Sequence, residues 1–334
     1  MEAFSSTSPG ARETYCPMRH VTVTATARLH FGFLDPSGRG KRPFGSFGLS
    51  LDRPRTRLQL ERAQALHVTG PKHQRAERYL KAIAASCGVE PRFALNVTET
   101  IPSHAGLGSG TQLALAVGSA FSAVERLDLS PQEIAKRLQR GARSGIGIFT
   151  FEQGGAVLDG GPSPQGAVPE LICRLPFPPA WRVLLIFDAS ASGLAGANET
   201  AAFDTLPDFP AEETAELRRR IADIALPALA ACDFATFCEQ VGYLQAVMGS
   251  YFAPLQGGPY TSVAVSEVLR WLGGQGLTGI GQSSWGPTGF AFIPSEAQGE
   301  ALLSEARARA RHAGISFELA QGRNEGAKIE TDAV

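Results

Sequence analysis

The sequence predicts an α+β fold in two domains. Segments typical of strands and helices are mixed along the 334 residues without the regular alternation of a doubly wound parallel sheet. Hydrophobic residues make up 43% of the chain, enough for a sizeable core. A proline-rich stretch, GGPSPQGAVPELICRLPFPPA at 160–180, is suited to join two domains. We therefore expect a mobile tail at 1–18, an N-terminal domain at 19–176 and a C-terminal domain at 177–334.

The first half begins with strand patterns. VTVTATARL at 21–29 and RFALNVTET at 92–100 alternate and are rich in β-branched residues. Between them, HFGFLDPSGRGKRPFGSFG at 30–48 is dense in glycine and predicts a long loop.

Two helices and a third glycine-rich segment follow. QLALAVGSAFSAVERL at 112–127 is an apolar helix. Ser130 as N-cap, with Pro131 and Glu133, marks the start of a helix that should end near Gly141. RSGIGIFTFEQGGAVLDGG, which follows, contains a short strand.

The second half begins with the strand WRVLLIFD at 181–188. Asp233 and Ser295 are predicted helix N-caps. Helices are expected near 212–226, 234–248, 261–273 and 296–313, and strands near 289–293 and 315–320.

Charge and cysteine content argue against several classes of protein. Lys plus Arg is 31 and Asp plus Glu is 32, so the net charge of −1 gives no reason to expect nucleic acid or an anionic membrane as partner. The five cysteines form no C-x-x-C pair, which suggests reduced thiols rather than a zinc site or disulfide framework. The N-terminus lacks the apolar centre of a signal peptide, and no apolar run is long enough for a membrane span. These features predict a cytoplasmic protein.

The sequence IPSHAGLGSGTQ at 101–112 predicts an anion site. Its glycines allow positive φ angles and close approach of a ligand, while Ser109 and Thr111 offer hydroxyl groups. The helix that follows directs unpaired N–H groups and the positive end of its dipole into the loop. The loop matches neither G-x-x-x-x-G-K-[ST] nor the dinucleotide pattern G-x-G-x-x-G. From spacing alone, a turn that merely joins strand to helix explains it equally well.

The pattern P-x-x-x-G-L-G-S-G resembles the phosphate loop of the GHMP kinase superfamily, which includes galactokinase, homoserine kinase and mevalonate kinase. The resemblance implies the GHMP kinase fold, with a ribosomal S5 domain 2-like N-terminal domain and a ferredoxin-like C-terminal domain. It also implies these phosphate-binding residues: Pro102, Ser103, Gly106, Leu107, Gly108, Ser109, Gly110, Thr111 and Gln112.

Four blocks carry a narrower resemblance, to the β-ribofuranosylaminobenzene 5′-phosphate synthases of methanopterin biosynthesis. They are ARLHFGFLD (27–35), IPSHAGLGSGTQLALAVG (101–118), RSGIGIFTFEQGGAVLDGG (143–161) and GQSSWGPTGF (281–290). This family condenses 5-phosphoribosyl-1-pyrophosphate (PRPP) with 4-aminobenzoate or 4-hydroxybenzoate and releases pyrophosphate and CO₂. The resemblance implies a decarboxylating pentosyltransferase, a homodimer and Mg²⁺ as cofactor.

The third block favours a synthase over a kinase. Many GHMP kinases have S-G-x-D there, with the Asp as catalytic base, whereas this chain has Ser144, Gly145, Ile146 and Gly147. A carbon nucleophile has no hydroxyl proton to remove, so it can do without that base. Asp159 could still serve as a displaced base. An ATP-dependent small-molecule kinase and a non-catalytic ligand sensor remain the alternatives.

The first block supplies three candidate catalytic residues. Arg28 and His30, two apart on a strand, can point the same way, for anion binding and proton handling respectively. Ordinary structural roles, as a surface Arg and a buried, hydrogen-bonded His, are the alternatives. Asp35 either binds Mg²⁺ or orients Arg28, or caps the turn before Pro36.

The third block adds Arg143, Ser144 and Asp159. Arg143 either contacts a phosphate or carboxylate or neutralises a helix C-terminus, and Ser144 is a candidate for substrate binding. Asp159 is either a metal or ribose ligand or a turn residue. Asp35 and Asp159 are thus the predicted Mg²⁺ ligands.

The fourth block resembles a glycine-rich loop beside the phosphate site. Ser283, Ser284 and Gly286 are expected to bind substrate, and Trp285 either stacks on the aromatic acid or packs between domains. His104 is a weak candidate inside the phosphate loop. A last cluster, Arg39, Lys41 and Arg42, either clamps the ribose 5-phosphate or is a solvated loop.

Overall fold

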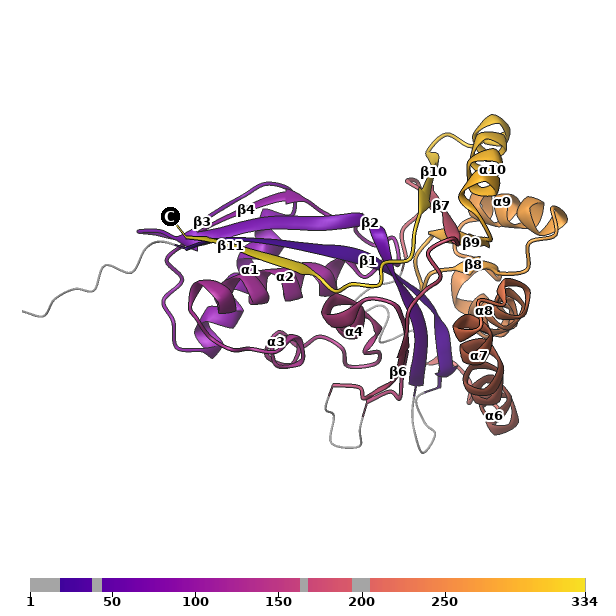
Figure 1. The fold of residues 1–334 in the computed structure, drawn as a ribbon, viewed down its shortest axis with the longest axis horizontal. Helices are drawn as coiled ribbons and strands as arrows, with labels where there is room; N and C mark the ends of the chain where they lie inside the picture. Colours follow the sequence, from indigo (N-terminus) through magenta and orange to yellow (C-terminus); the bar gives the residue numbers. More distant parts are fainter. Residues whose placement is uncertain (1–18, 38–43, 163–167, 194–204, 334) are drawn as a thin grey trace, which may run out of the picture.

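The computed structural model describes residues 19–37, 44–162, 168–193 and 205–333. These residues form two sheets, each covered by helices, and two long strands run from one part of the molecule into the other (Figure 1). The larger sheet lies on the left in Figure 1 with α1 to α4 below it, and the smaller sheet lies on the right with α6 to α10. The arrangement is α+β, as predicted.

The larger sheet has the strand order β11-β1-β2-β4-β3, with β5 paired to β2 and β6 paired to β5. β1 and β2 are antiparallel, and their register shifts between Thr26 and Arg28 and again between His30 and Gly32. Such irregularities bend a strand and re-aim its side chains. The strands are β1 (Arg19–Asp35), β2 (Phe44–Arg62), β3 (His67–Thr69), β4 (Phe93–Glu99), β5 (Ala156–Asp159), β6 (Leu171–Leu175) and β11 (Lys328–Ala333).

The loop predicted at 30–48 is wrong for much of its length, because β1 continues to Asp35 and β2 starts at Phe44. Gly48 of this region serves close packing rather than a turn. A Cβ atom at position 48 would lie 2.5 Å from the carbonyl oxygen of Leu29 and 2.6 Å from Ile146 Cγ2. Glycine density was therefore a misleading signal for a loop here.

The helices of this part pack against the larger sheet. Ser130 caps α3 through a capping box with Glu133, which confirms that prediction. α3 ends at Arg137, earlier than expected, because Gln139 already has a left-handed φ of 54°. α1 was missed, although Leu80, Ile83 and Ala84 have helical spacing. The helices are α1 (His73–Ser86), α2 (Ser109–Val124), α3 (Pro131–Arg137) and α4 (Ile146–Gln153).

The smaller sheet is antiparallel, in the order β10-β7-β9-β8. The predicted N-caps Asp233 and Ser295 both accept hydrogen bonds from the first turns of their helices. α8 is eight residues longer than predicted. The elements are β7 (Arg182–Asp188), α6 (Ala211–Arg219), a π-helical turn η1 (Arg220–Ala225), α7 (Leu226–Ala230), α8 (Phe234–Gln256), α9 (Val263–Gly274), β8 (Ile280–Gln282), β9 (Gly289–Ile293), α10 (Glu296–Arg309) and β10 (Ile315–Ala320).

The end of the chain returns to the first sheet. β11 pairs with β1 from Arg19↔Ala333 to Thr24↔Lys328, a strand that the sequence did not predict. The division at residues 176 and 177 stays a prediction, and β11 is the element that crosses it.

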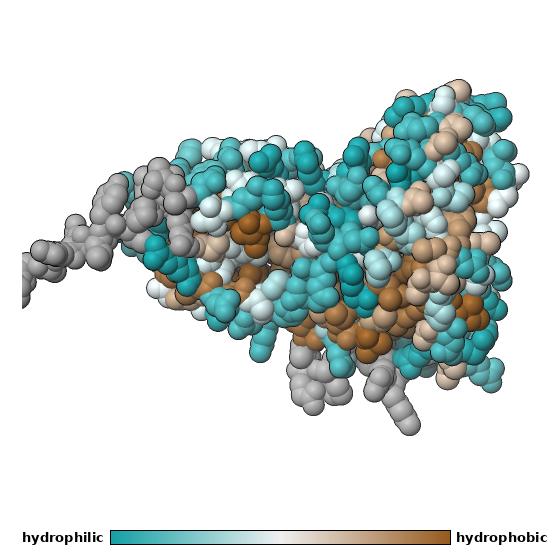
Figure 2. Space-filling view, viewed as in Figure 1, coloured by the Kyte–Doolittle hydropathy of each residue, from teal (hydrophilic) through white to brown (hydrophobic). Residues whose placement is uncertain are grey.

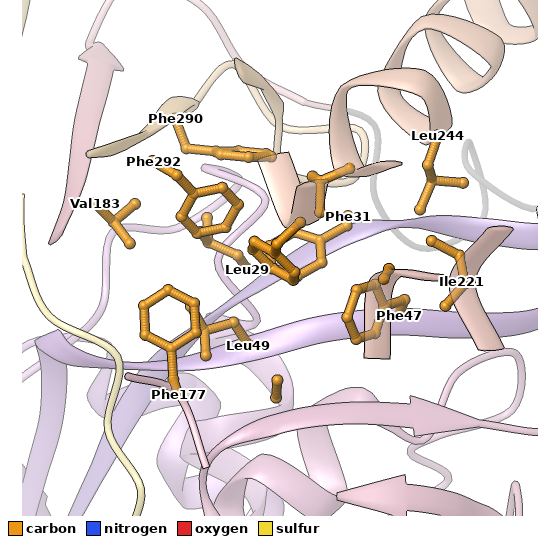
Figure 3. Close-up of a cluster of buried hydrophobic side chains, with 14 of the residues drawn as sticks. Leu29, Phe31, Phe47, Leu49, Phe177, Val183, Ile221, Leu244, Phe290 and Phe292 are labelled. Carbon is orange, nitrogen blue, oxygen red and sulfur yellow. The ribbon is translucent and has the colours of Figure 1, made fainter. Parts of the chain in front are cut away.

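An aromatic core joins the two parts (Figure 3). Phe31 of β1 and Phe47 of β2 are in edge contact at 5.1 Å between ring centroids, and Phe31 lies 5.5 Å from Phe292 of β9. Each fully buried side chain of this size contributes about 1.5–3 kcal/mol. The core therefore fixes the loop before β9 against the bent part of β1.

Hydrophilic residues cover most of the face drawn in Figure 2. Among the described residues, no helix has the length and hydropathy needed to cross a membrane.

Candidate active site

The phosphate loop ends at the N-terminus of α2. Gly106 and Gly108 have φ angles of 78° and 80°, which favour glycine, and Gly108 is the N-cap without a side-chain cap. The first turn, Ser109 to Thr111, therefore presents backbone N–H groups that no side chain of the cap satisfies. This is the local geometry of an anion site at a helix N-terminus.

The loop at 283–286 lies directly on the phosphate loop. A Cβ atom at Gly106 would lie 2.0 Å from the carbonyl oxygen of Ser283, and one at Gly286 would lie 2.1 Å from the backbone nitrogen of Gly106. Both positions therefore require glycine. Two loops from opposite halves of the chain are thus in backbone contact.

Hydrogen bonds from β1 connect the same two loops. His30 N donates to Ser283 Oγ at 3.0 Å, and Ser283 Oγ donates to the carbonyl oxygen of Gly106 at 2.8 Å. Ser284 N donates to the carbonyl oxygen of His30 at 3.1 Å, and the Arg28 guanidinium donates to the same Gly106 carbonyl. Ser283 is fully buried, so its position fits fixing the two loops rather than the predicted donation to phosphate.

A cavity of about 670 Å³ opens beside the phosphate loop. Its volume is in the usual range for small-molecule sites. Its lining contains Arg and backbone groups but no carboxylate from the described residues. The predicted residues that line it are Arg28, His104, Gly106, Gly108, Ser109, Gly110, Thr111, Ser284, Trp285 and Gly286.

Four further arginines, which sequence reasoning missed, line the same cavity. They are Arg75 and Arg78 of α1, and Arg137 and Arg140 at the end of α3. The spacing of Arg75, Arg78 and Tyr79 on one helix face was an available signal. It was overlooked because α1 itself was not predicted.

His30 points into a second, much smaller cavity. This space of about 30 Å³ is lined by His30, Met248, Phe252 and Trp285, among others, and Ser284 and Trp285 line both cavities. Burial, with a smaller effect of Arg28, lowers the pKa of His30 to about 3, so its imidazole is neutral near pH 7. Within the described part of the chain, neither ring nitrogen has a hydrogen-bond partner.

The carboxylate of Asp159 is also buried, but unlike the imidazole of His30 it accepts hydrogen bonds on both oxygens. Its Oδ1 accepts from the backbone nitrogens of Ser46 at 3.1 Å and Gly161 at 2.9 Å, and its Oδ2 accepts from Gly145 N at 2.7 Å and Ser144 Oγ at 3.2 Å. Burial still raises its pKa to about 6. The carboxylate lines neither cavity and is surrounded by its own donors, so the geometry fits a structural anchor better than the predicted base or metal ligand.

The remaining predicted residues lie outside both cavities. Asp35 ends β1 and accepts from Ser37 Oγ at 2.7 Å, and Arg143 is half-buried before α4. Gln112 donates to the carbonyl oxygen of Gly147 at 2.8 Å and links α2 to α4. Pro102, Ser103, Leu107 and Ser144 likewise line neither cavity. Arg39, Lys41 and Arg42 lie outside the described residues.

Gly147 lies against the phosphate loop. A Cβ atom there would be 3.1 Å from Thr111 Cγ2, a tight contact. A carboxylate at this position would project toward the loop that is expected to hold phosphate. Its absence leaves the large cavity without a carboxylate base from the described residues.

The described residues do not fit a resident metal centre. They contain no group of three or more His, Cys, Asp or Glu side chains placed to hold an ion. The predicted ligands Asp35 and Asp159 pair with different residues of β2, Phe44 and Ser46, and neither reaches the large cavity. Mg²⁺ is commonly held by one or two carboxylates together with substrate phosphates and water, so Mg²⁺ as a cofactor stays a prediction.

Sequence comparisons identify relatives of this chain. Residues 74–155 match the family model of the GHMP kinases N terminal domain. The β-ribofuranosylphenol 5′-phosphate synthase of Archaeoglobus fulgidus is 30% identical, and the match covers 82% of this chain and 88% of the relative. The protein with the same name from Methanothermobacter thermautotrophicus is 26% identical, over 79% of this chain and 86% of the relative.

Solved structures show the same fold at low identity. Homoserine kinase of Cytophaga hutchinsonii superimposes with a TM-score of 0.67 at 16% identity, over 93% of this chain and 97% of that one. Mevalonate diphosphate decarboxylase of Staphylococcus aureus gives a TM-score of 0.66 at 12% identity, over 94% and 98%. The predicted GHMP kinase fold is thereby confirmed.

Proposed function

The chain belongs to the β-ribofuranosylphenol 5′-phosphate synthase family, and from that premise we propose that it condenses PRPP with 4-hydroxybenzoate or 4-aminobenzoate. The reaction releases pyrophosphate and CO₂ and belongs to methanopterin biosynthesis. The observation that carries the proposal is a cationic cavity at the phosphate loop that lacks a carboxylate from the described residues. Such a site suits departure of an anionic leaving group, and its described lining residues offer no carboxylate as the general base of a kinase.

The phosphate loop would hold the leaving pyrophosphate. As the bond between ribose C1 and the pyrophosphate oxygen breaks, negative charge develops on that oxygen. Backbone N–H groups of Ser109 to Thr111 are already fixed by α2 and stabilise this charge without reorganisation. Arg28 lies at the same place, held on the Gly106 carbonyl.

The acceptor would bind where the two cavities meet. Trp285 and Ser284 line both, and the neutral His30 lies beyond them. The smaller cavity holds about one or two water molecules and not a benzoate, so the ring must enter from the larger cavity. We place the aromatic ring on Trp285, with its hydroxy or amino group toward the unpartnered nitrogens of His30.

The bond changes balance without an added oxidant or reductant. The ring carbon that bears the carboxylate forms a bond to ribose C1, and the C1–oxygen bond to pyrophosphate breaks. The carboxyl group then leaves as CO₂, and its electron pair restores the aromatic ring. The contribution of the protein is alignment and charge stabilisation. Mg²⁺ is proposed only as a counter-ion that arrives with pyrophosphate substrates; a homodimer and a cytoplasmic location stay predictions.

Isotope release tests the proposal. Purified protein receives PRPP with carboxyl-labelled 4-hydroxybenzoate in one reaction and carboxyl-labelled 4-aminobenzoate in another, and labelled CO₂ and pyrophosphate are measured together. Equal amounts of the two products are expected with at least one acceptor, and the faster acceptor identifies the substrate. A parallel reaction with ATP and homoserine tests the kinase alternative. ADP formation there, with no CO₂ in the other reactions, would overturn the synthase.

A further inference from the structure

Four arginines line the large cavity together with Arg28. Arg75 and Arg78 come from α1, whereas Arg137 is the last residue of α3 and Arg140 follows it in the next loop. The chain as a whole has a net charge of −1. This local concentration of positive charge is therefore not a consequence of a basic protein.

Tyr79 fixes the centre of the cluster. Its ring is 9% exposed and packs in the core between the larger sheet and its helices. Arg140 Nη2 donates to the Tyr79 hydroxyl at 2.7 Å, and the Arg140 guanidinium lies 5.1 Å from the ring centroid. Arg137 is held by a 2.9 Å bond to the carbonyl oxygen of Ser86. Because these guanidinium groups are fixed before a ligand arrives, little side-chain entropy is lost when one binds.

The cluster lacks the carboxylate partners that arginines have elsewhere in this protein. Arg55 pairs with Glu99, Arg182 with Glu296 and Arg220 with Glu216, at 2.7–3.0 Å.

By contrast, Arg75, Arg78 and Arg140 form no salt bridge within the described part of the chain. Arg140 Nε is also buried there without a hydrogen-bond partner. A buried donor that lacks a partner is destabilising, and a bound anion would remove that cost.

The cluster adjoins the phosphate loop but differs from it in chemistry. A Cβ atom at Gly110 would lie 3.8 Å from Arg75 Nη1 and 3.9 Å from the Tyr79 hydroxyl. The loop offers backbone N–H groups, whereas the cluster offers guanidinium groups, which bind terminal phosphate oxygens in pairs. The cavity therefore has two adjacent anion subsites of different kinds.

We propose that Arg75, Arg78, Arg137 and Arg140 form a second anion subsite that binds the 5-phosphate of PRPP, while the phosphate loop binds its pyrophosphate. This inference rests on the proposed function. PRPP carries a phosphate monoester at one end of the ribose and a pyrophosphate at the other, so it has one group for each subsite. The cluster then selects 5-phosphorylated ribose and turns C1 toward the acceptor.

Binding measurements with the two separate halves of the substrate test the assignment. Ribose 5-phosphate and inorganic pyrophosphate are titrated separately into wild type, R75M, R140M and S109A by calorimetry. R75M and R140M should weaken the binding of ribose 5-phosphate by roughly 10- to 100-fold, since each removes a charge-assisted contact. The binding of pyrophosphate should weaken far less. S109A removes one hydroxyl from the phosphate loop and keeps its backbone N–H groups, so its loss of affinity should be smaller and should fall on pyrophosphate rather than on ribose 5-phosphate. K136M is the matched control, because Lys136 is exposed on α3 and does not line the cavity.

Steady-state kinetics provide the second readout. R75M and R140M should raise KM for PRPP by a similar factor, with a smaller change in kcat, and K136M should match wild type. R75M covers the case in which R140M unfolds through loss of its bond to Tyr79. Unchanged affinity for ribose 5-phosphate in both R75M and R140M would overturn the inference. A selective loss of affinity for pyrophosphate in these variants would overturn it as well. If wild type binds both ligands but releases no CO₂, the proposed function fails while the subsite assignment is still decided by the titrations.

Discussion

Strands β1 and β2 carry buried polar residues at two places, and these places differ in how the polar atoms are satisfied. At the bend, the neutral His30 has no hydrogen-bond partner for its ring among the described residues, and it neighbours Arg28 beside two cavities. Farther along, Asp35 accepts from Ser37, and Asp159 on the neighbouring β5 accepts four hydrogen bonds. Sequence reasoning had placed all four residues in one catalytic group.

The difference separates a site prepared for a ligand from a site that stabilises the fold. Buried polar atoms are almost always paired in native proteins, so the exceptions need an explanation. Asp159 needs none, because its donors come from β2, from the start of α4 and from its own turn. His30 does need one, and the acceptor placed there in the proposed function would supply it. The expected experimental signature is loss of turnover at the bend and loss of stability at Asp159.

The largest effect is expected for Arg28→Met. The substitution removes a guanidinium that lines the cavity and contacts the phosphate loop. We expect kcat/KM for PRPP to fall by roughly 10²–10³-fold, the range for removal of one preorganised donor to a developing anion. The free energy of unfolding should change much less. Initial rates of CO₂ release and urea unfolding, measured on the same preparation, check both parts.

The matched control is Arg53→Met, because Arg53 also lies on a long strand but is exposed and pairs with Asp52 away from the cavities. Equal losses of turnover in the two variants would show that the bend has no special role.

Asp159→Ala should give the opposite result. It leaves three buried backbone N–H groups and the Ser144 hydroxyl without their acceptor. We expect a loss of about 2–4 kcal/mol in the free energy of unfolding, measured in urea at pH 7.5. Turnover by the protein that remains folded should stay close to wild type. A folded Asp159→Ala enzyme as inactive as Arg28→Met would mean that Asp159 acts in the reaction.

Gly147→Asp tests the same contrast by adding a carboxylate beside the phosphate loop. The new charge would lie close to Thr111, in the loop expected to hold pyrophosphate. Like-charge repulsion in a partly desolvated site should lower kcat/KM for PRPP by roughly 10- to 30-fold. Gly147→Asn, of nearly the same size, separates the effect of charge from that of the tight contact. If the two variants are equally impaired, sterics alone accounts for the requirement for glycine.

Local signals in the sequence predicted local structure well. The cap at Ser130, the strands at 289–293 and 315–320 and the phosphate loop before α2 follow from residue type and spacing over a few positions. What was missed depends on contacts between distant segments. The return of β11 to β1, and the lining of one cavity by both Arg75 and Arg140, cannot be recognised from either segment alone. The environment of Asp159 could not be predicted for the same reason, since three of its four donors precede it by 14 to 113 residues.

The smallest effect is a pH dependence that belongs to His30. Burial lowers its folded pKa from 6.5 to about 3, so between these values the unfolded chain binds a proton that the folded protein does not. The free energy of unfolding therefore falls as pH falls through this window, by up to about 1.4 kcal/mol per pH unit. His30→Asn cannot titrate, so the stability of wild type relative to this variant should fall steadily as pH is lowered from about 6.5 to pH 5. Asp159, whose raised pKa of about 6 has the opposite effect, is present in both proteins and cancels. A difference that stays constant over this range would mean that the folded and unfolded chains bind the same number of protons at His30, and a pKa lowered by burial would then have to be abandoned.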